Sequence, residues 1–281
     1  MFKILEKAEL NPSMTKMVVE APLIAKKAKP GQFIIFRVDE YGERVPLTIA
    51  DTDSEVGSVT IIFQKLGVST MLLGSLNAGD YILDFVGPLG TPTELSDCKR
   101  AAVIGGGAGC AIAYPQAKAL FKMGVDVDVI AGFRSTDLII LEDEMKAVSS
   151  RLFVLTDDGS NGNKGFVTNA LENNIKNGSD YDLVIAIGPV PMMKAVCGIT
   201  KQHNIKTIVS MNPIMIDGTG MCGGCRLTVG GKTKFACVDG PDFDGFEVDF
   251  DELMKRNSMY RNMEQKARCE GCRLLDKAEV K

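Results

Sequence analysis

The sequence contains one histidine and no tryptophan among its 281 residues. A single histidine cannot supply a multi-histidine metal site, and it leaves little for mechanisms that depend on a histidine general base. A basic stripe is also missing, because 36 acidic and 32 basic side chains are well mixed and give a net charge of -4. Nucleic acid is therefore not expected as a partner. The reactive group of this protein is expected to be a bound cofactor.

Long apolar runs are absent as well. The longest uncharged run, 101–117, is interrupted by glycines and a proline, whereas a membrane span needs roughly twenty apolar residues. The N-terminal residues lack the apolar segment and small-residue cleavage site of a secretory signal. These features predict a soluble cytoplasmic protein that does not bind a membrane.

The hydrophobic pattern changes once along the chain, whose length fits two domains and a small third one. Short alternating apolar runs before about Gly90, such as 33–38 and 59–63, predict an antiparallel barrel or sandwich. From about Arg100, alternating strand and helix signals predict a parallel sheet covered by helices. The expected strands there are 101–104, 125–130, 152–155, 183–187 and 207–210, with a helix over 141–148.

The cysteines are concentrated after residue 220, where five of the eight lie. With Asp217 in place of a first cysteine, Cys222, Cys225 and Cys237 have the C-x4-C-x2-C…C spacing of 2Fe-2S sites. The glycines between them let backbone amides turn toward inorganic sulfide. The spacing predicts a 2Fe-2S cluster on these four residues. A zinc site combining Cys222 and Cys225 with the C-x-x-C pair 269–272 is the alternative. That pair is otherwise a contribution to a partner's cluster or two thiols in a tail.

Four loops predict a nucleotide pocket. The run Gly105 to Gly109 lies between an expected strand and helix, where free amides can receive a pyrophosphate, although such turns also occur for packing alone. The loops 132–135, 156–160 and 188–192 follow other expected strands, and ligands of open α/β sheets bind at that edge. In the barrel region, the segments 44–48, 67–70 and 87–90 could hold a flavin, with Arg44 as the cation for its diphosphate. Taken alone, an arginine such as Arg44 is more often a surface salt-bridge residue.

In chain order these motifs are R-x-P-L-T, G-x-S-T, G-P-L-G, the glycine turn, T-D-D-G-S, G-P-x-x-M and the cysteine loop. Over about residues 1–250 the sequence resembles the ferredoxin-NADP reductase superfamily. The most similar branch contains the electron-transfer subunit of dihydroorotate dehydrogenase and the small subunit of NADH-dependent reduced ferredoxin:NADP oxidoreductase, also called sulfide dehydrogenase beta subunit. The dihydroorotate type has four cysteines in this loop, whereas Asp217 with three cysteines resembles the ferredoxin:NADP type.

The resemblance implies a β-barrel flavin domain plus an α/β parallel-sheet nucleotide-binding domain, with a small iron-sulfur domain. The implied boundaries are 1–97 for the FAD-binding β-barrel, 98–210 for the NAD(P)-binding domain, 211–250 for the 2Fe-2S domain and 251–281 for a C-terminal helix and tail. The implied FAD contacts are Arg44, Val45, Pro46, Leu47, Thr48, Ile62, Phe63, Gln64, Gly67, Ser69 and Thr70. The implied NAD(H) contacts are Gly105, Gly106, Gly107, Ala108, Gly109, Arg134, Asp158 and Gly188. Arg134 could equally accept the 2′-phosphate of NADP(H), so the choice between NAD(H) and NADP(H) stays open.

The function that the resemblance implies is electron transfer between NAD(H) and a partner subunit through FAD and the cluster, in a flavin-based electron-bifurcating ferredoxin:NADP oxidoreductase. Hydride exchange between nicotinamide and flavin precedes one-electron steps, and no side chain is expected to act as a catalytic acid or base. The implied partner is a larger subunit with a second flavin and 4Fe-4S clusters, and ferredoxin is reached through it. One alternative is the same chemistry in an NAD-dependent dihydroorotate dehydrogenase. The other is a nucleotide-binding assembly subunit with structural zinc.

Overall fold

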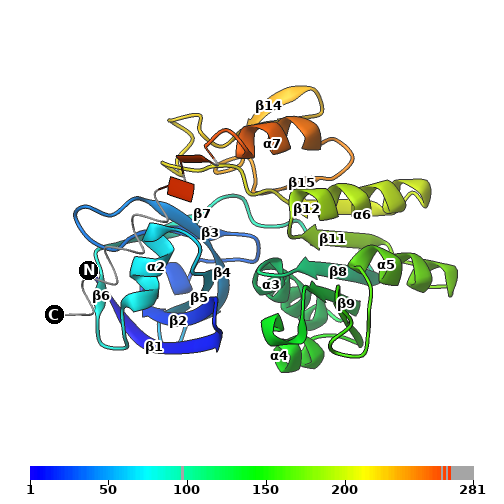
Figure 1. The fold of residues 1–281 in the computed structure, drawn as a ribbon, viewed down its shortest axis with the longest axis horizontal. Coiled ribbons are helices and arrows are strands. Elements are labelled where there is room, and N and C mark those ends of the chain that lie inside the picture. Colours follow the sequence, from blue (N-terminus) through cyan, green and yellow to red (C-terminus); the bar gives the residue numbers. More distant parts are fainter. Residues whose placement is uncertain (96–97, 261, 264, 267–281) are drawn as a thin grey trace.

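The computed structural model describes residues 1–95, 98–260, 262–263 and 265–266. Two bodies lie side by side, one formed by the N-terminal strands and the other by a helix-covered sheet (Figure 1). The segment 211–257 lies along one side of both bodies (Figure 1). None of the helices within the described ranges has the length and hydropathy of a membrane span.

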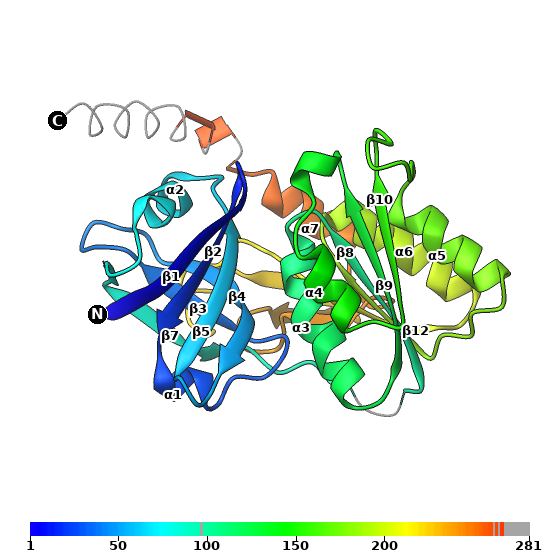
Figure 2. The same cartoon turned by 90° about the horizontal axis from the view of Figure 1, so that it is seen from below.

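The N-terminal body is a seven-stranded antiparallel sheet that curls into a barrel, with the strand order β6-β1-β2-β5-β4-β3-β7 (Figure 2). Alternating side chains of these strands point inward, and Met17, Ile34, Phe36 and Ile61 are completely buried. The elements are β1 (Phe2–Asn11), β2 (Met14–Glu20), α1 (Pro22–Ala25), β3 (Phe33–Arg37), β4 (Val45–Asp53), β5 (Ser58–Gln64), α2 (Val68–Ser75), β6 (Tyr81–Ile82) and β7 (Asp84–Leu89).

The second body is a six-stranded sheet in the order β10-β9-β8-β11-β12-β15, parallel except for its last strand. Helices α3 and α4 cover one face, and α5 and α6 cover the other (Figure 2). Strands β8 and β11 are apolar and buried on both faces, as expected for a covered parallel sheet. The elements are β8 (Arg100–Gly106), α3 (Gly109–Lys122), β9 (Asp126–Phe133), a 3-10 turn (Thr136–Leu138), α4 (Glu142–Ala147), β10 (Arg151–Thr156), α5 (Val167–Lys176), β11 (Leu183–Ile187), α6 (Val190–Gln202) and β12 (Lys206–Ser210).

The cysteine-containing segment does not form a core of its own. It contains a hairpin of β13 (Arg226–Val229) and β14 (Lys232–Phe235), then β15 (Asp242–Asp244) and α7 (Phe250–Asn257). Strand β15 extends the parallel sheet by pairing antiparallel with β12. Leu227, Phe243 and Leu253 join the same hydrophobic cluster as Met193 and Val209 of the α/β domain. The segment is therefore stabilised by packing on its neighbour as well as by its predicted cluster.

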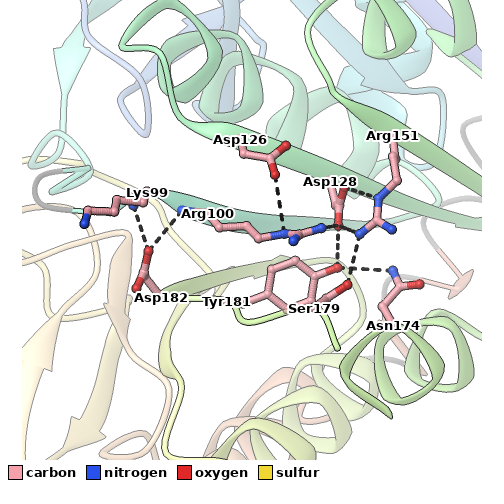
Figure 3. A network of polar contacts seen from close by, with 9 residues as sticks. All are labelled: Lys99, Arg100, Asp126, Asp128, Arg151, Asn174, Ser179, Tyr181 and Asp182. Carbon is pink, nitrogen blue, oxygen red and sulfur yellow. Dashed lines mark hydrogen bonds and ion pairs between the residues drawn. The ribbon is translucent and has the colours of Figure 1, made fainter. Parts of the chain in front are cut away.

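A buried acid, Asp128, lies near the N-terminal end of the parallel strands (Figure 3). Arg151 Nε donates to its Oδ1 at 2.8 Å, and the Tyr181 hydroxyl donates to its Oδ2 at 2.6 Å. Arg100 Nη2 lies 3.6 Å from the same Oδ2. Burial raises the pKa of Asp128, but the hydrogen bonds from Arg151 and Tyr181 and the charges of both arginines outweigh it, so the pKa is lowered. The network joins β8, β9, β10 and the segment before β11.

Candidate functional site

A pocket of about 700 Å³ opens at the C-terminal end of the parallel sheet, where Gly106 to Gly109 lead from β8 into α3. Its volume lies in the range of cofactor sites. Helix α3 begins without a side-chain cap. The N–H groups of Cys110 and Ala111 donate to the carbonyls of Gly107 and Ala108, which leaves the N–H groups of Ala108 and Gly109 for an anionic ligand. Gly107, with a φ of 55°, donates its N–H to the Gly132 carbonyl at 2.8 Å. This bond fixes the glycine turn against β9.

Glycine is required where two chain segments meet at the floor of the pocket. A Cβ on Gly109 would lie 2.3 Å from the Ile187 carbonyl oxygen, and one on Gly188 would lie 3.1 Å from Cα of Gly106. Side chains there would push α3 and the start of α6 away from the sheet. The predicted residues Gly106, Gly107, Ala108, Gly109 and Gly188 line the pocket, and Gly105 is buried in the adjoining strand β8.

The rim of the pocket combines the loops after β9 and β10. Arg134 lines the pocket with Asp157, whereas the predicted Asp158 is not among the lining residues. Asp158 Oδ1 instead accepts from Ser160 N at 2.9 Å and from Ser160 Oγ at 2.7 Å, and these bonds lower the pKa of Asp158. Ser160 Oγ also accepts from Thr136 N at 2.8 Å, so the two loops are joined. Asp158 therefore supports the rim through Ser160 and does not line the pocket.

The barrel contributes one side of the pocket. Gln64, which the resemblance implies, lines it together with Asn11, Ser13 and Met14 of the β1–β2 turn. Asn11 Oδ1 accepts from the N–H groups of Ser13 and Met14, both at 2.9 Å, and its Nδ2 donates to the Leu138 carbonyl at 3.2 Å. The turn therefore ties the barrel to the rim after β9. No motif in the sequence marks it.

Two of the three barrel segments expected at the flavin, 44–48 and 67–70, lie beside each other. Ser69 Oγ donates to Glu43 Oε2 at 3.3 Å, which places the start of α2 next to the segment 44–48. Thr70 Oγ1 accepts from the two backbone N–H groups that lead into α2, at 3.0 and 3.1 Å. Within the described chain Arg44 has no ion pair, so its charge is available to an anionic group. This arrangement fits the diphosphate of FAD.

The β13–β14 hairpin brings two of the predicted cluster ligands together. Cys225 precedes β13 and Cys237 follows β14, and Ala236 N donates to the Cys225 carbonyl at 3.2 Å. Both cysteines are buried, and Cys222 is exposed. Burial, together with the neighbouring Cys225 and Cys222, raises the pKa of Cys237 to about 12. The three predicted thiol ligands therefore lie near one another.

Asp217, the predicted fourth ligand, lies between the cysteine loop and the barrel. Its Oδ2 accepts from the N–H groups of Thr219 at 3.0 Å and Met221 at 3.4 Å. The hydroxyl and N–H of Thr219, with a smaller contribution from Arg44, lower the pKa of Asp217. A Cβ on Gly218 would lie only 2.3 Å from Cδ1 of a barrel residue, Ile35. The cysteine loop thus packs directly on the barrel, near the flavin segment.

The donor set is compatible with a two-iron cluster. Across the described residues, no group of three or more His, Cys, Asp or Glu side chains converges on one metal position. A 2Fe-2S cluster distributes its four ligands over two irons, so such convergence is not required. Gly224 N lies 3.4 Å from Cys222 Sγ, a hydrogen bond to sulfur of the kind that tunes such clusters. The zinc alternative needs Cys269 and Cys272, which lie outside the described residues.

Two family models match the chain. Residues 212–249 match the iron-sulfur cluster binding domain of dihydroorotate dehydrogenase B. Residues 103–198 match an oxidoreductase NAD-binding domain. The matched ranges contain the cysteine loop and the glycine turn, respectively.

Curated relatives cover nearly the whole chain. A homologue of the electron transfer subunit of dihydroorotate dehydrogenase B (NAD(+)) from Thermotoga maritima is 44% identical over 94% of this chain and 93% of its own length. The electron transfer subunit from Bacillus caldolyticus is 34% identical over 83% of this chain and 91% of its own. An uncharacterized protein from Clostridium beijerinckii is 51% identical over 96% of this chain and 94% of its own.

Solved structures share the fold. A structure of the NADH-dependent reduced ferredoxin-NADP oxidoreductase, which gives insights into flavin-based electron bifurcation, has a TM-score of 0.91 and 42% identity and covers 98% of both chains. The cytochrome b5 reductase domain of Ulva prolifera nitrate reductase, at 17% identity and a TM-score of 0.61, covers 73% of this chain and 92% of that chain and shares the fold alone. These matches confirm the predicted fold class and the family resemblance.

Proposed function

This chain belongs to the family of dihydroorotate dehydrogenase B electron-transfer subunits and their homologues, and we propose that it passes electrons between NAD(H) and a partner subunit. Bound FAD would exchange a hydride with the nucleotide, and a 2Fe-2S cluster would take single electrons onward. The observation that carries the proposal is the meeting of three sites at one junction. Gln64 joins the barrel to the nucleotide pocket, and the cysteine loop packs at Gly218 on Ile35, the β3 residue that pairs with Pro46.

We assign the chain's own residues as follows. Arg44 and the N-terminus of α2 would bind the FAD diphosphate, with the remaining contacts from Val45, Pro46, Leu47, Thr48, Ile62, Phe63, Gln64, Gly67, Ser69 and Thr70. The N–H groups of Ala108 and Gly109 would bind the nucleotide diphosphate beside Gly106 and Gly107, with Gly188 at the floor and Asp158 supporting the rim. Asp217, Cys222, Cys225 and Cys237 would hold the cluster. The proposed domain ranges remain 1–97, 98–210, 211–250 and 251–281.

We propose NAD(H) as the nucleotide. Among the described residues that line the pocket, Arg134 is the only cation, and Asp157 lines the rim beside it. A carboxylate accepts a hydrogen bond from a ribose hydroxyl of NAD(H) and repels the 2′-phosphate of NADP(H). The matching domain family is also an NAD-binding one.

We propose that the partner is a larger subunit carrying a second flavin and 4Fe-4S clusters. Ferredoxin would exchange electrons with that subunit. We propose that the complex acts in the cytoplasm. The relatives are electron-transfer subunits, and such a subunit requires a partner. Cys222 is exposed, and three apolar side chains of the same segment, Ile216, Met221 and Val238, are exposed as well. A partner that docks there would cover apolar surface and stand next to the cluster.

The second candidate is the electron-transfer subunit of an NAD-dependent dihydroorotate dehydrogenase. The names of the matching cluster domain and of several relatives favour it. Asp217 at the position of a first cysteine favours the ferredoxin:NADP type. Co-purification of the native partner, followed by assays with dihydroorotate and with reduced ferredoxin, separates the two.

The proposal is tested by the composition of the purified protein. We expect bound FAD, and we expect the amount of iron to equal the amount of acid-labile sulfide. Cys225→Ala should lose the iron and keep both the FAD and its bleaching by NADH, because the barrel and the nucleotide pocket do not depend on that thiol. A colourless protein that contains zinc and no flavin would support the assembly-subunit alternative.

A further inference from the structure

Two arginines hydrogen-bond to the glycines between Cys222 and Cys225. Arg256 Nη2, from α7, donates to the Gly224 carbonyl at 3.2 Å. Arg226 Nη1, from the start of β13, donates to the Gly223 carbonyl at 3.1 Å. The two side chains therefore reach the same short loop from different elements.

The two arginines differ in their exposure to water. Arg226 is exposed, whereas Arg256 is half-buried and its Nε is buried without a hydrogen-bond partner among the described residues. Arg256 also has no ion pair in the described chain. Glu252, one turn earlier on α7, directs its Oε2 to the N–H of Thr228 at 3.1 Å. A partly buried charge without a counter-charge is costly, which indicates that a negative group normally lies nearby.

We propose that the negative group is the cluster, and that Arg256 is a charge-compensating residue that raises the reduction potential of the cluster. This inference rests on the proposed function. Reduction adds one electron and no proton, so it adds one negative charge to a site that three thiolates and a carboxylate already make anionic. A nearby cation that water screens only partly favours the reduced form. The charge of Arg226 is exposed and is screened by water and salt.

The test is a potentiometric titration of the full-length holoprotein with dithionite, in which EPR follows the reduced cluster. Arg256→Met should lower the equilibrium constant for reduction about tenfold, which is ~59 mV for a one-electron couple. Arg256→Lys keeps the charge and should stay within about threefold of the wild type. Arg226→Met is the matched control, because it removes an exposed cation from the same loop, and it should also change the constant by less than about threefold.

Glu252→Gln provides a second test if Arg256→Met does not retain iron. It removes an acid from the same face of α7 and should raise the equilibrium constant. A loaded Arg256→Met protein with a wild-type potential would overturn the inference, as would an equal drop in Arg226→Met. An unchanged potential in Glu252→Gln, combined with loss of iron from Arg256→Met, would also overturn it. A wild-type protein without iron would contradict the proposed function instead, so the two failures are distinguishable.

Discussion

The two ends of the parallel sheet differ in how their polar groups are satisfied. At the N-terminal end, Asp128 is buried and accepts hydrogen bonds from Arg151 and Tyr181 (Figure 3). At the C-terminal end, the uncapped start of α3 and the glycine turn Gly106 to Gly109 face an open pocket. A buried and hydrogen-bonded acid joins the strands, and free N–H groups beside a pocket can receive a ligand. Stability and ligand binding should therefore be separable along the same strands.

The largest effect is expected at the N-terminal end of the sheet, where Asp128 is buried. Asp128→Asn should lower the free energy of unfolding by about 3 kcal/mol, because it leaves Arg151 without a carboxylate partner and removes the buried one of the two that Arg100 has. The affinity for NADH should not change. Urea unfolding and an NADH binding titration measure the two quantities. Asp126→Asn is the matched control on the same strand, since its half-exposed ion pair with Arg100, at 3.5 Å, should contribute less than about 0.5 kcal/mol. Equal losses in both variants would contradict the special role of the buried acid.

The next largest effect is expected at the C-terminal end of the sheet, and it concerns ligand binding and not stability. Gly107→Asp should weaken NADH binding about 100-fold, because it places a carboxylate at the site of the nucleotide diphosphate. Aspartate tolerates a positive φ, and a Cβ there has open space, so the unfolding free energy should change little. Gly124→Asp is the control, because Gly124 also has a positive φ and open space but lies at the other end of α3. Similar NADH affinities in the two variants would mean that this pocket does not bind the nucleotide.

Much of this framework is predictable from the sequence because local patterns determine it. The strand Leu183–Ile187 is predicted with both ends, since an apolar run is bounded by Asp182 and Gly188. The prediction for β9 ends at Ile130, but the strand continues to Phe133, because Gly132 pairs with β8 although glycine usually signals a loop. Strand β15 has no local signal at all. Its position depends on pairing with β12, a contact between distant parts of the chain.

The candidate site shows the same division. Glycine and cysteine spacings predict the pocket floor and the three thiols, because backbone approach and metal binding demand those residue types. The sequence does not predict Asn11, Ser13 and Met14, which reach the pocket only through the packing of the barrel on the α/β domain. Nor does it predict that Asp157 lines the pocket in place of Asp158, which depends on the hydrogen bonds of Ser160.

A smaller effect is expected from acid. The folded-state pKa of Asp128 is lowered, so its contribution to stability is present above the pKa of an unfolded aspartate and is lost as the pH falls through the folded value. The difference in unfolding free energy between the wild type and Asp128→Asn should therefore narrow below about pH 4. Urea unfolding of both proteins between neutral and acidic pH measures it. A difference that stays constant into acid would mean that the carboxylate charge does not stabilise this end.

The smallest effect concerns the rim. Arg134→Gln should reduce the affinity for NADPH by about tenfold and that for NADH by less than about threefold, because only the former has a phosphate for the guanidinium to meet. Paired binding titrations with the two nucleotides give the ratio. An equal loss for both would place Arg134 at the shared diphosphate, and the ratio of the wild type itself tests the proposed NAD(H) preference.

The most direct test of the electron-transfer account is an anaerobic titration of the purified protein with NADH, in which absorbance follows the flavin and EPR follows the cluster. The account predicts that the flavin bleaches and that the signal of a reduced 2Fe-2S cluster appears in the same titration. A protein that contains zinc, lacks flavin and gives no EPR signal after NADH would contradict it.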